Sequence, residues 1–450
     1  MYDVIIIGGG PGGYLAAERA AHAKLSTLVI EKRALGGVCL NEGCVPSKTF
    51  LNSAKVLDYA NHGEAYGVTV KTPATLDHAA VVKRKNGVVK MLTGGIKAQL
   101  KAAKATVIIG EAQILGKEAG LFQVSVNGEN HSGKNLIIAT GSEAIVPPVT
   151  GADKPIVMTN REILDIEKIP KNLVVIGGGV IGLEMASYFN SAGSKVTVIE
   201  MLPNIAGQND TDIGSILMKN YQDKGVTFLL GAKVVEIKDK AVVYEKDGVT
   251  TEVKADAALM SIGRRPVSQG YGLETLNVEM DRSAIKTDEQ CKTSIPNLYA
   301  IGDVNGKSML AHTAYREAEV AVSTILGNKD AVNYRSIPAV IYTSPEVGAV
   351  GETEATATAK GIDFTVKTIP LTYSGRYVAE NSVTDGICKL LVNNKTGRLI
   401  GVHMIGSYAS EIIMNAAIMI DTEMHIDRIK KLVFPHPTVC EIVREGIFMF

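Results

Sequence analysis

The sequence has no net charge and no long hydrophobic run. Its 47 lysine and arginine residues balance 47 aspartate and glutamate residues, so nothing indicates a nucleic acid or an anionic membrane surface as a partner. No apolar stretch approaches the roughly 18 residues of a membrane-spanning helix. The first residues, MYDVIIIGGG, lack the basic region of a signal peptide. We therefore expect a cytoplasmic protein without a membrane span.

Cysteine is scarce, with five residues among 450. Three cysteines are scattered along the chain: Cys291, Cys388 and Cys440. This distribution is unlike the disulfide framework of a secreted domain. The other two, Cys39 and Cys44, lie within GGVCLNEGCVPSK, residues 36–48. No Cys or His close in sequence completes the roughly four ligands of a zinc site, so we expect no metal there. The pair is either redox-active or two inert thiols.

The spacing of this pair indicates its local structure. At about 3.6 residues per turn, positions five apart point about 140° away from each other, so the pair does not share one helical face. We expect Cys39 on a distorted turn and a helix beginning near Cys44, because Pro46 suits the first turn of a helix. The helix N-terminus and the charge of Lys48 would favour a thiolate.

A glycine-rich turn lies between an apolar strand and a helix near the start of the chain. Within residues 3–31, Gly8, Gly10 and Gly13 form G-x-G-x-x-G, and a second strand ends on Glu31. Such glycines allow a pyrophosphate to approach a helix N-terminus, and the acidic residue accepts a hydrogen bond from a ribose. The triplet alone is a weak signal, so the flanking strand–helix–strand pattern carries the prediction of a dinucleotide site.

The same pattern recurs at a constant offset of 169 residues without a gap. Within residues 172–200, Gly177, Gly179 and Gly182 correspond to the first three glycines, and Glu200 corresponds to the first acidic residue. Two copies of one unit predict two bound dinucleotides. The alternative is two nucleotide folds that have lost their ligands.

The remaining stretches differ in pattern. Residues 47–104 are mostly helical, whereas residues 121–141 and 233–263 alternate like β-meanders that lead into apolar strands. Pro147 and Pro148 indicate a linker between the two units. Residues 309–327 indicate a further helix.

The C-terminal part changes character from Ile337. The sequence there predicts antiparallel strands with a hairpin turn at residues 393–397. Residues 409–420 form a helix that is apolar on most faces, so we expect it to be buried. A strongly apolar domain of this kind is often a dimer surface.

Two polar motifs near strand and chain ends are candidate site residues. The strand in residues 296–303 ends on Asp303, where a parallel sheet often contacts a ligand; the alternative is a turn aspartate. His436 lies between two prolines, which fix the backbone, and Glu441 follows. A carboxylate on one imidazole nitrogen would leave the other as an acid/base. The alternative is a structural histidine, which we expect for His22, His62, His78, His131, His403 and His425.

These motifs, in this order, resemble the flavoprotein pyridine nucleotide–disulfide oxidoreductases over the whole chain. The resemblance implies an α/β fold with two Rossmann-like dinucleotide-binding domains and a C-terminal α+β interface domain, in a homodimer whose active site spans both subunits. The implied domains are FAD-binding (1–143), NAD-binding (144–264), central (265–335) and interface or dimerisation (336–450).

The resemblance also assigns roles to individual residues. It makes Cys39 the thiol that meets the substrate and Cys44 the thiol against the flavin, joined as a redox disulfide. It makes His436 an acid/base from the partner subunit, oriented by Glu441 and followed by a cis bond before Pro437. An ion pair beside the flavin is implied for Lys48 and Glu184. The implied cofactor-binding residues are Gly8, Gly10, Gly12, Gly13, Glu31, Lys48, Thr140, Gly141, Asp303, Ala311, Gly177, Gly179, Gly182, Glu200 and Gly263.

The implied reaction is the oxidation of protein-bound dihydrolipoamide, with electrons passing through the Cys39–Cys44 disulfide and FAD to NAD⁺. Glu200 favours NAD over NADP, because its charge repels a 2′-phosphate. The implied partners are lipoyl domains of an acyltransferase component of a 2-oxo acid dehydrogenase complex or the H protein of glycine cleavage. Two alternatives stay open: an NAD(P)H-dependent reductase of another disulfide, and a non-catalytic flavin-bearing redox sensor or structural subunit.

Four positions depart from the family pattern. Val38 replaces a usual threonine, Thr313 a frequent lysine, and Phe434 and Ser344 frequent histidines. These departures concern the substrate channel and the catalytic efficiency rather than the fold.

Overall fold

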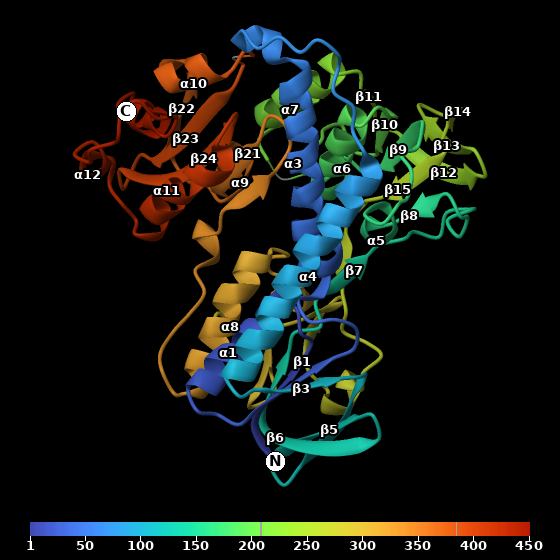
Figure 1. Cartoon of the computed structure of the whole chain (residues 1–450). Coiled ribbons are helices and arrows are strands. Elements are labelled where there is room, and N and C mark those ends of the chain that lie inside the picture. The colour runs from blue at the N-terminus through green and yellow to red at the C-terminus, as the bar shows by residue number, and fades with distance from the viewer. Residues whose placement is uncertain (208, 384) are drawn as a thin grey trace. The chain divides into compact units, whose positions relative to one another are not determined.

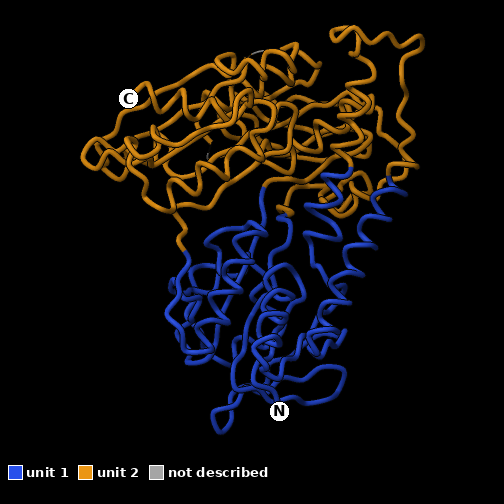
Figure 2. Tube along the Cα trace, turned by 60° about the vertical axis from the view of Figure 1, so that its left-hand side comes forward, with its two compact units in different colours: residues 1–49, 82–145, 263–332 blue, residues 50–81, 146–262, 333–450 orange. Residues whose placement is uncertain are grey.

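The computed structural model describes residues 1–207, 209–383 and 385–450, and Figure 1 shows its helices and strands. The chain divides into two compact units, each with its own sheets and hydrophobic core (Figure 2). Unit 1 comprises residues 1–49, 82–145 and 263–332, and unit 2 comprises residues 50–81, 146–262 and 333–450.

A seven-stranded sheet is the framework of unit 1. Its long strand β6 takes part in two kinds of pairing: residues 129–133 pair antiparallel with β5, and residues 133–138 pair in parallel with β1. The predicted meander and the apolar strand that follows it therefore meet in one strand. The members are β1 (Tyr2–Ile7), β2 (Thr27–Glu31), β3 (Thr106–Ile109), β4 (Ala112–Glu118), β5 (Leu121–Val126), β6 (Glu129–Ile138) and β19 (Leu298–Ala300).

The helices of unit 1 cover this sheet and carry the first predicted nucleotide motif. Helix α1 (Pro11–His22) connects β1 to β2 and packs against α8 (Ala311–Ile325). Strand β1 is buried from Val4 to Ile7, as expected for a parallel strand with elements on both faces. Helices α3 (Cys44–Asn61) and α4 (His78–Ala102) account for the predicted helical character of residues 47–104, and each contains a boundary between the two units.

Unit 2 begins with a parallel sheet that repeats the arrangement of β1, α1 and β2. Helix α6 (Val180–Ser191) connects β9 to β10, and the strand order is β11-β10-β9-β15-β8. The predicted internal repeat is therefore confirmed. The strands are β8 (Val157–Met158), β9 (Asn172–Ile176), β10 (Lys195–Glu200), β11 (Thr227–Leu230) and β15 (Ala257–Met260), with helices α5 (Asn160–Ile163) and α7 (Thr211–Asp223).

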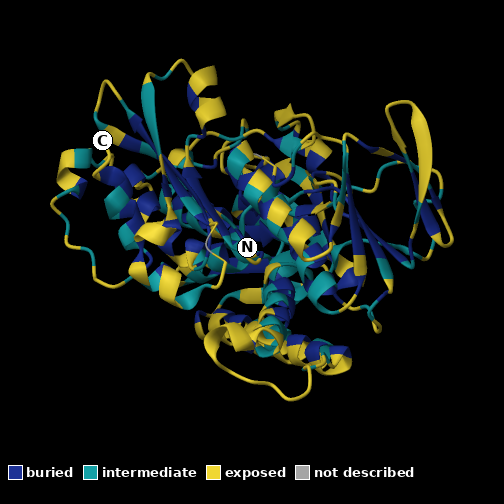
Figure 3. Cartoon of the chain, turned by 90° about the horizontal axis from the view of Figure 1, so that it is seen from above, coloured by how far each residue is buried: buried dark blue, intermediate teal, exposed yellow. Residues whose placement is uncertain are grey.

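The meander of unit 2 forms a sheet of its own, unlike the meander of unit 1. Its strands are β12 (Lys233–Lys238), β13 (Ala241–Lys246) and β14 (Val249–Lys254). The outer strand β14 is mostly exposed, whereas β15 is fully buried in the parallel sheet. Figure 3 shows the same contrast between buried sheet centres and exposed edges. The predicted change from meander to apolar strand thus takes place between two sheets.

The C-terminal sheet of unit 2 is antiparallel, as predicted, in the order β20-β21-β24-β23-β22. Helix α11 (Ala409–Asp421) packs on β21 and β24. The strands are β20 (Ala339–Ile341), β21 (Val347–Gly351), β22 (Phe364–Pro370), β23 (Ile387–Asn393) and β24 (Arg398–Ile405), and the helices around them are α9 (Glu354–Ala359), α10 (Gly375–Glu380), α12 (Ile426–Ile429) and α13 (Glu441–Ile447).

The expectation that α11 is buried is wrong for one side of the helix. Its sheet-facing residues are buried, but Met414 is 53% exposed and Ile418 is 47% exposed. The reason is that only one side of the helix lies on the sheet, which leaves an apolar stripe uncovered in the single chain. Among the described residues, no helix is long and apolar enough to cross a membrane.

A buried lysine joins three carboxylates in unit 2. The side chain of Lys389 in β23 is 5% exposed, and its Nζ lies 2.7 Å from Asp212, 2.6 Å from Glu354 and 3.5 Å from Asp210. His403, on the neighbouring strand, is also buried and donates its Nε2–H to the Glu352 carbonyl at 2.8 Å. Lys389 therefore ties the start of α7 to the C-terminal sheet.

We expect Lys389→Met to lower the free energy of unfolding by on the order of 3 kcal/mol, because the substitution leaves carboxylates close together without their buried cation. Thermal unfolding of the holoenzyme measures this change as a lower melting temperature. The control is Lys238→Met, which breaks the exposed pair with Glu252 and should leave the melting temperature unchanged. Equal melting temperatures for both variants would show that Lys389 has no such stabilising role.

Candidate active site

Both glycine turns hold a helix tightly against the preceding strand. A Cβ atom on Gly13 would lie 1.8 Å from the carbonyl oxygen of Gly8, and one on Gly182 would lie 2.4 Å from that of Gly177. Gly8 also has a φ of +107°, a conformation that side chains rarely adopt. The first and third glycines of each motif are therefore required by the fold itself.

The middle glycine of each motif instead faces open space. A Cβ on Gly10 would come no closer than 3.8 Å to another atom, and one on Gly179 no closer than 4.0 Å. Each of these residues is the N-cap of its helix and has no side chain to satisfy the free N–H groups. An open backbone surface with free N–H groups fits a dinucleotide pyrophosphate, so the residues present fit FAD and NAD.

The two acidic residues at the strand ends stabilise these turns by hydrogen bonds. Glu31 accepts the N–H of Gly9 through Oε2 at 2.7 Å and that of Arg33 through Oε1 at 2.7 Å. Glu200 accepts the N–H of Gly178 at 2.6 Å and that of Leu202 at 2.7 Å. Because each carboxylate oxygen has a second lone pair, both residues can still accept a ribose hydroxyl.

The different surroundings of the glycines lead to a prediction. We expect Gly13→Ala to prevent stable folding, because its Cβ would collide with the Gly8 backbone. Gly10→Ala should fold normally but retain FAD at least about tenfold more weakly, because its methyl group occupies the space that the pyrophosphate needs. Circular dichroism measures folding, and flavin fluorescence after dialysis measures retention. Normal FAD retention by Gly10→Ala would contradict the assignment of this turn.

The cysteine segment consists of two helices separated by a glycine. Cys39 lies in α2 (Gly37–Glu42), and α3 begins at Cys44 with Pro46 in its first turn. The predicted helix start is therefore confirmed, but the expected distorted turn at Cys39 is wrong. Gly43, with φ −146° and ψ −112°, breaks the helix instead, and this break brings the two thiols together.

The two thiols are in contact. The sulfurs of Cys39 and Cys44 form a side-chain hydrogen bond. This bond raises the pKa of the Cys39 thiol, and burial raises it further, while the charge of Lys48 acts in the opposite direction. Two sulfurs this close, one partly buried and one exposed, can exchange between dithiol and disulfide.

The cysteine segment is attached directly to the first glycine turn. The N–H of Gly36 donates to the carbonyl of Gly9 at 2.8 Å. A Cβ on Gly37, which has a φ of +56°, would lie 2.7 Å from the Cα of Gly10. The dithiol and the predicted FAD pyrophosphate site therefore belong to one rigid piece of unit 1.

Asp303 follows β19 and belongs to a polar network that the sequence did not reveal. Its Oδ2 accepts a short hydrogen bond from the hydroxyl of Ser142, and Arg264 Nε donates to the same hydroxyl at 2.7 Å. The fully buried Glu317 fixes the loop by accepting the N–H of Gly302 at 2.5 Å and the side-chain amide of Asn305 at 2.9 Å. No local pattern marks Ser142, Arg264 or Glu317, because their partners are distant in sequence.

The other predicted cofactor residues of unit 1 surround the same region. Thr140 donates its hydroxyl to the Val267 carbonyl at 2.6 Å, and Ala311 is the first residue of α8. Gly12 packs against the Ile301 side chain. Gly141 and Gly263 have φ values of +72° and +131° and lie beside the strand pair β7 (Ser142–Ala144) and β16 (Arg264–Pro266).

Lys48 and Glu184 belong to different units. Lys48 lies in the second turn of α3. Glu184 lies in α6, is 3% exposed and accepts the N–H of Tyr342 at 3.0 Å. Their ion pair stays a prediction.

The structure brings His436 and Glu441 together. Nδ1 of His436 lies 2.7 Å from Oε1 of Glu441, whose Oε2 accepts the N–H of Thr438 at 2.8 Å. The peptide bond before Pro437 is cis, in agreement with the resemblance. The imidazole is 78% exposed and the carboxylate 16% exposed. A proton on Nδ1 is held by the carboxylate, so Nε2 is left to accept a proton.

The ionisation of Glu441 follows from its surroundings. Partial burial favours the neutral carboxyl group, but the hydrogen bonds from Thr438 and His436 outweigh it and hold the pKa of Glu441 below its usual range. The residue is therefore a carboxylate at neutral pH. Its contribution to stability is fully present above its unfolded-state pKa and is lost as the pH falls through the lower folded-state pKa.

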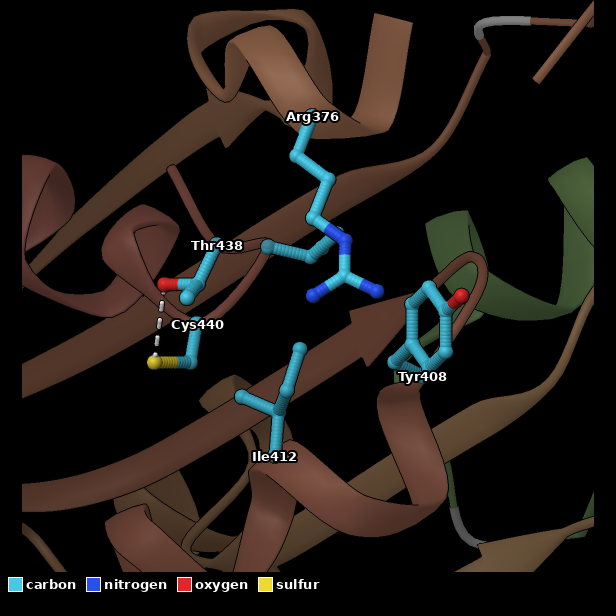
Figure 4. Close-up of a pocket in the computed structure, with 6 residues that line it drawn as sticks. Arg376, Tyr408, Ile412, Thr438 and Cys440 are labelled. Carbon is cyan, nitrogen blue, oxygen red and sulfur yellow. Dashed lines mark hydrogen bonds between the residues drawn. The ribbon is translucent and has the colours of Figure 1, made fainter. Parts of the chain in front are cut away.

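A small pocket lies beside the His436 loop (Figure 4). It has a volume of about 170 Å³ and is lined by Arg376, Tyr408, Ile412, Thr438, Val439 and Cys440. The Arg376 guanidinium lies over the Tyr408 ring at 5.2 Å, and Thr438 Oγ1 is 3.3 Å from Cys440 Sγ. Pockets for cofactors are typically about 300 Å³ or larger, and none of the predicted site residues lines this one.

The departures from the family pattern have ordinary contacts in the structure. Thr313 is buried and its hydroxyl lies 2.8 Å from that of Ser308. Ser344 precedes a second cis proline and accepts Lys224 Nζ on its carbonyl at 3.1 Å. Phe434 packs on the C-terminal core, and Val38 contacts Gly43. Among the histidines expected to be structural, His78 is buried and lies 2.8 Å from the Tyr188 hydroxyl.

The fold and the site together define a class of α/β proteins. Its members have two dinucleotide-binding units and a dithiol on the segment attached to the first glycine turn. The chain belongs to the family of pyridine nucleotide-disulphide oxidoreductases, because residues 2–318 match the family's model and residues 337–447 match the model of its dimerisation domain.

The chain is similar over nearly its full length to curated members of this family. It is 39% identical to dihydrolipoyl dehydrogenase from Mycoplasma genitalium, over 99% of this chain and 97% of that protein. Identity to dihydrolipoyl dehydrogenase from Geobacillus stearothermophilus is 38%, over 99% and 95%. The enzyme of the same name from Acholeplasma laidlawii is 47% identical over 72% of this chain and 96% of that protein.

Solved structures agree with the fold. The crystal structure of LpdA from Mycobacterium tuberculosis superimposes with a TM-score of 0.90 at 25% identity, covering 99% of both chains. The HOCl-induced flavoprotein disulfide reductase RclA from Escherichia coli superimposes with a TM-score of 0.87 at 26% identity, covering 100% of both chains. The predicted α/β fold with a C-terminal dimerisation domain is therefore confirmed.

Proposed function

We propose that this chain is a dihydrolipoyl dehydrogenase that oxidises protein-bound dihydrolipoamide with NAD⁺. The observation that carries the proposal is the contact between Cys39 and Cys44 on a segment attached to the first glycine turn. Such an arrangement would put a dithiol beside a dinucleotide bound at that turn. The names of the full-length relatives support the choice of substrate.

The proposed assembly is a cytoplasmic homodimer with four domains in each chain: residues 1–143, 144–264, 265–335 and 336–450. The exposed apolar stripe of Met414 and Ile418 supports a partner surface on the dimerisation domain. His436 would then serve the dithiol of the partner subunit. Lipoyl domains of an acyltransferase component or of an H protein would bring the substrate.

FAD would be held by the first glycine turn, Glu31, Lys48, Thr140, Gly141, Asp303 and Ala311, and NAD by the second turn, Glu200 and Gly263. When bound, FAD would supply an acceptor for the electron pair of the dithiol, and NAD⁺ would supply the final hydride acceptor. The ion pair of Lys48 with Glu184 would place a positive charge beside the flavin.

The residues of this chain then perform the thiol chemistry. Nε2 of His436 removes a proton from one substrate thiol, while Glu441 holds Nδ1–H. The resulting thiolate attacks Sγ of Cys39 in the Cys39–Cys44 disulfide, and Cys44 leaves as a thiolate. The second substrate sulfur attacks the mixed disulfide, and its proton passes to Cys39, which leaves as a thiol. Lipoamide is released as a cyclic disulfide, and both cysteines are left reduced.

A panel of substrates tests this function. The purified holoenzyme should reduce NAD⁺ with dihydrolipoamide and should not reduce oxidised glutathione or coenzyme A disulfide with NADH or NADPH. A second candidate function is the reduction of another disulfide, and the superposition on the disulfide reductase RclA is the observation that supports it. Reduction of one of those disulfides without oxidation of dihydrolipoamide would establish that candidate instead.

The choice of nucleotide gives a separate prediction. We expect kcat/KM for NAD⁺ to exceed that for NADP⁺ by on the order of 100-fold, because the Glu200 carboxylate would face the 2′-phosphate of NADP⁺ with like charge. Steady-state rates with each nucleotide measure the ratio. Glu200→Gln keeps a side chain of the same size and should reduce the ratio, whereas an unchanged ratio would remove Glu200 from the determinants of selectivity.

A further inference from the structure

Two tyrosines form a hydrogen-bonded pair in unit 1. Tyr14 lies on α1, four residues after Gly10, and Tyr315 lies on α8, which packs along α1. Their phenol oxygens are 2.5 Å apart, and the rings meet edge to face with centroids 6.0 Å apart. Both side chains are partly buried. The short contact fixes the two hydroxyl groups relative to each other.

The pair lies close to the dithiol. The start of α2 rests on Gly9 and Gly10, one turn before Tyr14, so Cys39 in α2 and Tyr14 in α1 belong to the same rigid piece. Burial raises the pKa of both phenols, and negative charge on the two sulfurs raises it further. The phenols therefore stay protonated at neutral pH and act as hydrogen-bond donors rather than as bases.

A count of protons leaves one donor unused. The pair has two O–H groups, and the bond between the two oxygens uses one of them. Within the part of the chain that the structure describes, neither phenol oxygen has another hydrogen-bond partner. The second O–H is thus available to a group that becomes charged during the reaction.

We propose that Tyr14 donates this hydrogen bond to the Cys39 thiolate, and that Tyr315 is a positioning residue that holds the Tyr14 hydroxyl by donating to its oxygen. Tyr14 is the direct donor because its helix contacts the cysteine segment. The inference rests on the proposed function only in naming Cys39 as the thiol that exchanges with substrate. It adds a tyrosine pair to the residues that stabilise the thiolate form of Cys39.

A hydrogen bond to the charged form lowers the pKa of a thiol. Tyr14→Phe should therefore raise the apparent pKa of Cys39 by about one unit, which slows its alkylation about tenfold at a pH below that pKa. Tyr315→Phe should produce a smaller shift in the same direction. The double variant should match Tyr14→Phe alone, because the two residues act in series.

The test is the pH dependence of iodoacetamide alkylation. The holoenzyme is reduced anaerobically with one equivalent of dithionite, and the alkylation of each cysteine is followed by peptide mass spectrometry, with the half-buried Cys440 as an internal reference. Tyr299→Phe is the control, because this phenol is also in unit 1, and its pKa is raised by burial and by Asp288 rather than by the sulfurs of Cys39 and Cys44. Shifts in Tyr14→Phe and Tyr315→Phe but not in Tyr299→Phe support the proposal.

Profiles identical to wild type in both pair variants would overturn it. Each variant keeps its aromatic ring, and FAD content and melting temperature show whether the fold is retained. Alkylation requires no lipoamide, so the experiment can contradict the proposed function and the role of the tyrosine pair independently. A wild type inactive with dihydrolipoamide but showing the shift overturns only the proposed function, and an active wild type without the shift overturns only the tyrosine pair.

Discussion

Cys39→Ser is expected to lower the rate of NAD⁺ reduction by dihydrolipoamide by at least about 10³-fold, since a hydroxyl group cannot form the mixed disulfide with the substrate. The FAD content should stay normal, because Cys39 lies in α2 after the glycines that contact the first turn. Steady-state turnover at saturating substrate, together with the flavin absorbance, measures both properties.

Cys440→Ser is the matched control. Cys440 is also partly buried, lies in the C-terminal part of unit 2 and contacts Thr438. The Cys440→Ser variant should retain wild-type turnover. If Cys39→Ser also kept its activity, electrons would not pass through the dithiol, and a sensor or structural role for the cysteine pair would gain support.

His436→Gln should reduce turnover by about 10²–10⁴-fold, the usual contribution of a positioned acid/base. Glu441→Gln should reduce turnover less, by about tenfold, because it weakens the hydrogen bond to Nδ1 of His436 without removing the base. Steady-state rates at neutral pH measure both losses, with Glu441 ionised because its pKa is lowered.

The control for the histidine is His22→Gln, an exposed residue in the last turn of α1. It should leave the turnover rate unchanged. Mixing inactive Cys39→Ser with inactive His436→Gln subunits should restore activity in the heterodimer, because one of its two active sites then has both intact residues. An inactive heterodimer would place His436 and Cys39 of the same chain in one site.

Local signals in the sequence predicted those parts of the structure that depend on neighbouring residues. The two strand–glycine–helix units follow from steric demands of Gly13 and Gly182. The start of α3 follows from Pro46, and the pairing of His436 with Glu441 spans five residues. Each of these features is decided within one turn or one loop.

Features that depend on distant contacts could not be predicted. The break at Gly43 gives Cys39 a short helix that the spacing alone did not indicate. Ser142 meets Arg264 across 122 positions, and Tyr14 meets Tyr315 across 301. The exposed side of α11 depends on which face the sheet covers. Such contacts form only when separate segments of the chain pack together.

The most direct test of the account is an anaerobic titration of the holoenzyme with dihydrolipoamide, followed by NAD⁺. One equivalent per subunit should produce the long-wavelength absorbance of a thiolate beside oxidised flavin, and NAD⁺ should then restore the oxidised spectrum. Cys44→Ser should show no such band. A wild-type protein whose spectrum does not respond to dihydrolipoamide, although dithionite reduces its flavin, would contradict the proposed path from substrate through Cys39 and Cys44.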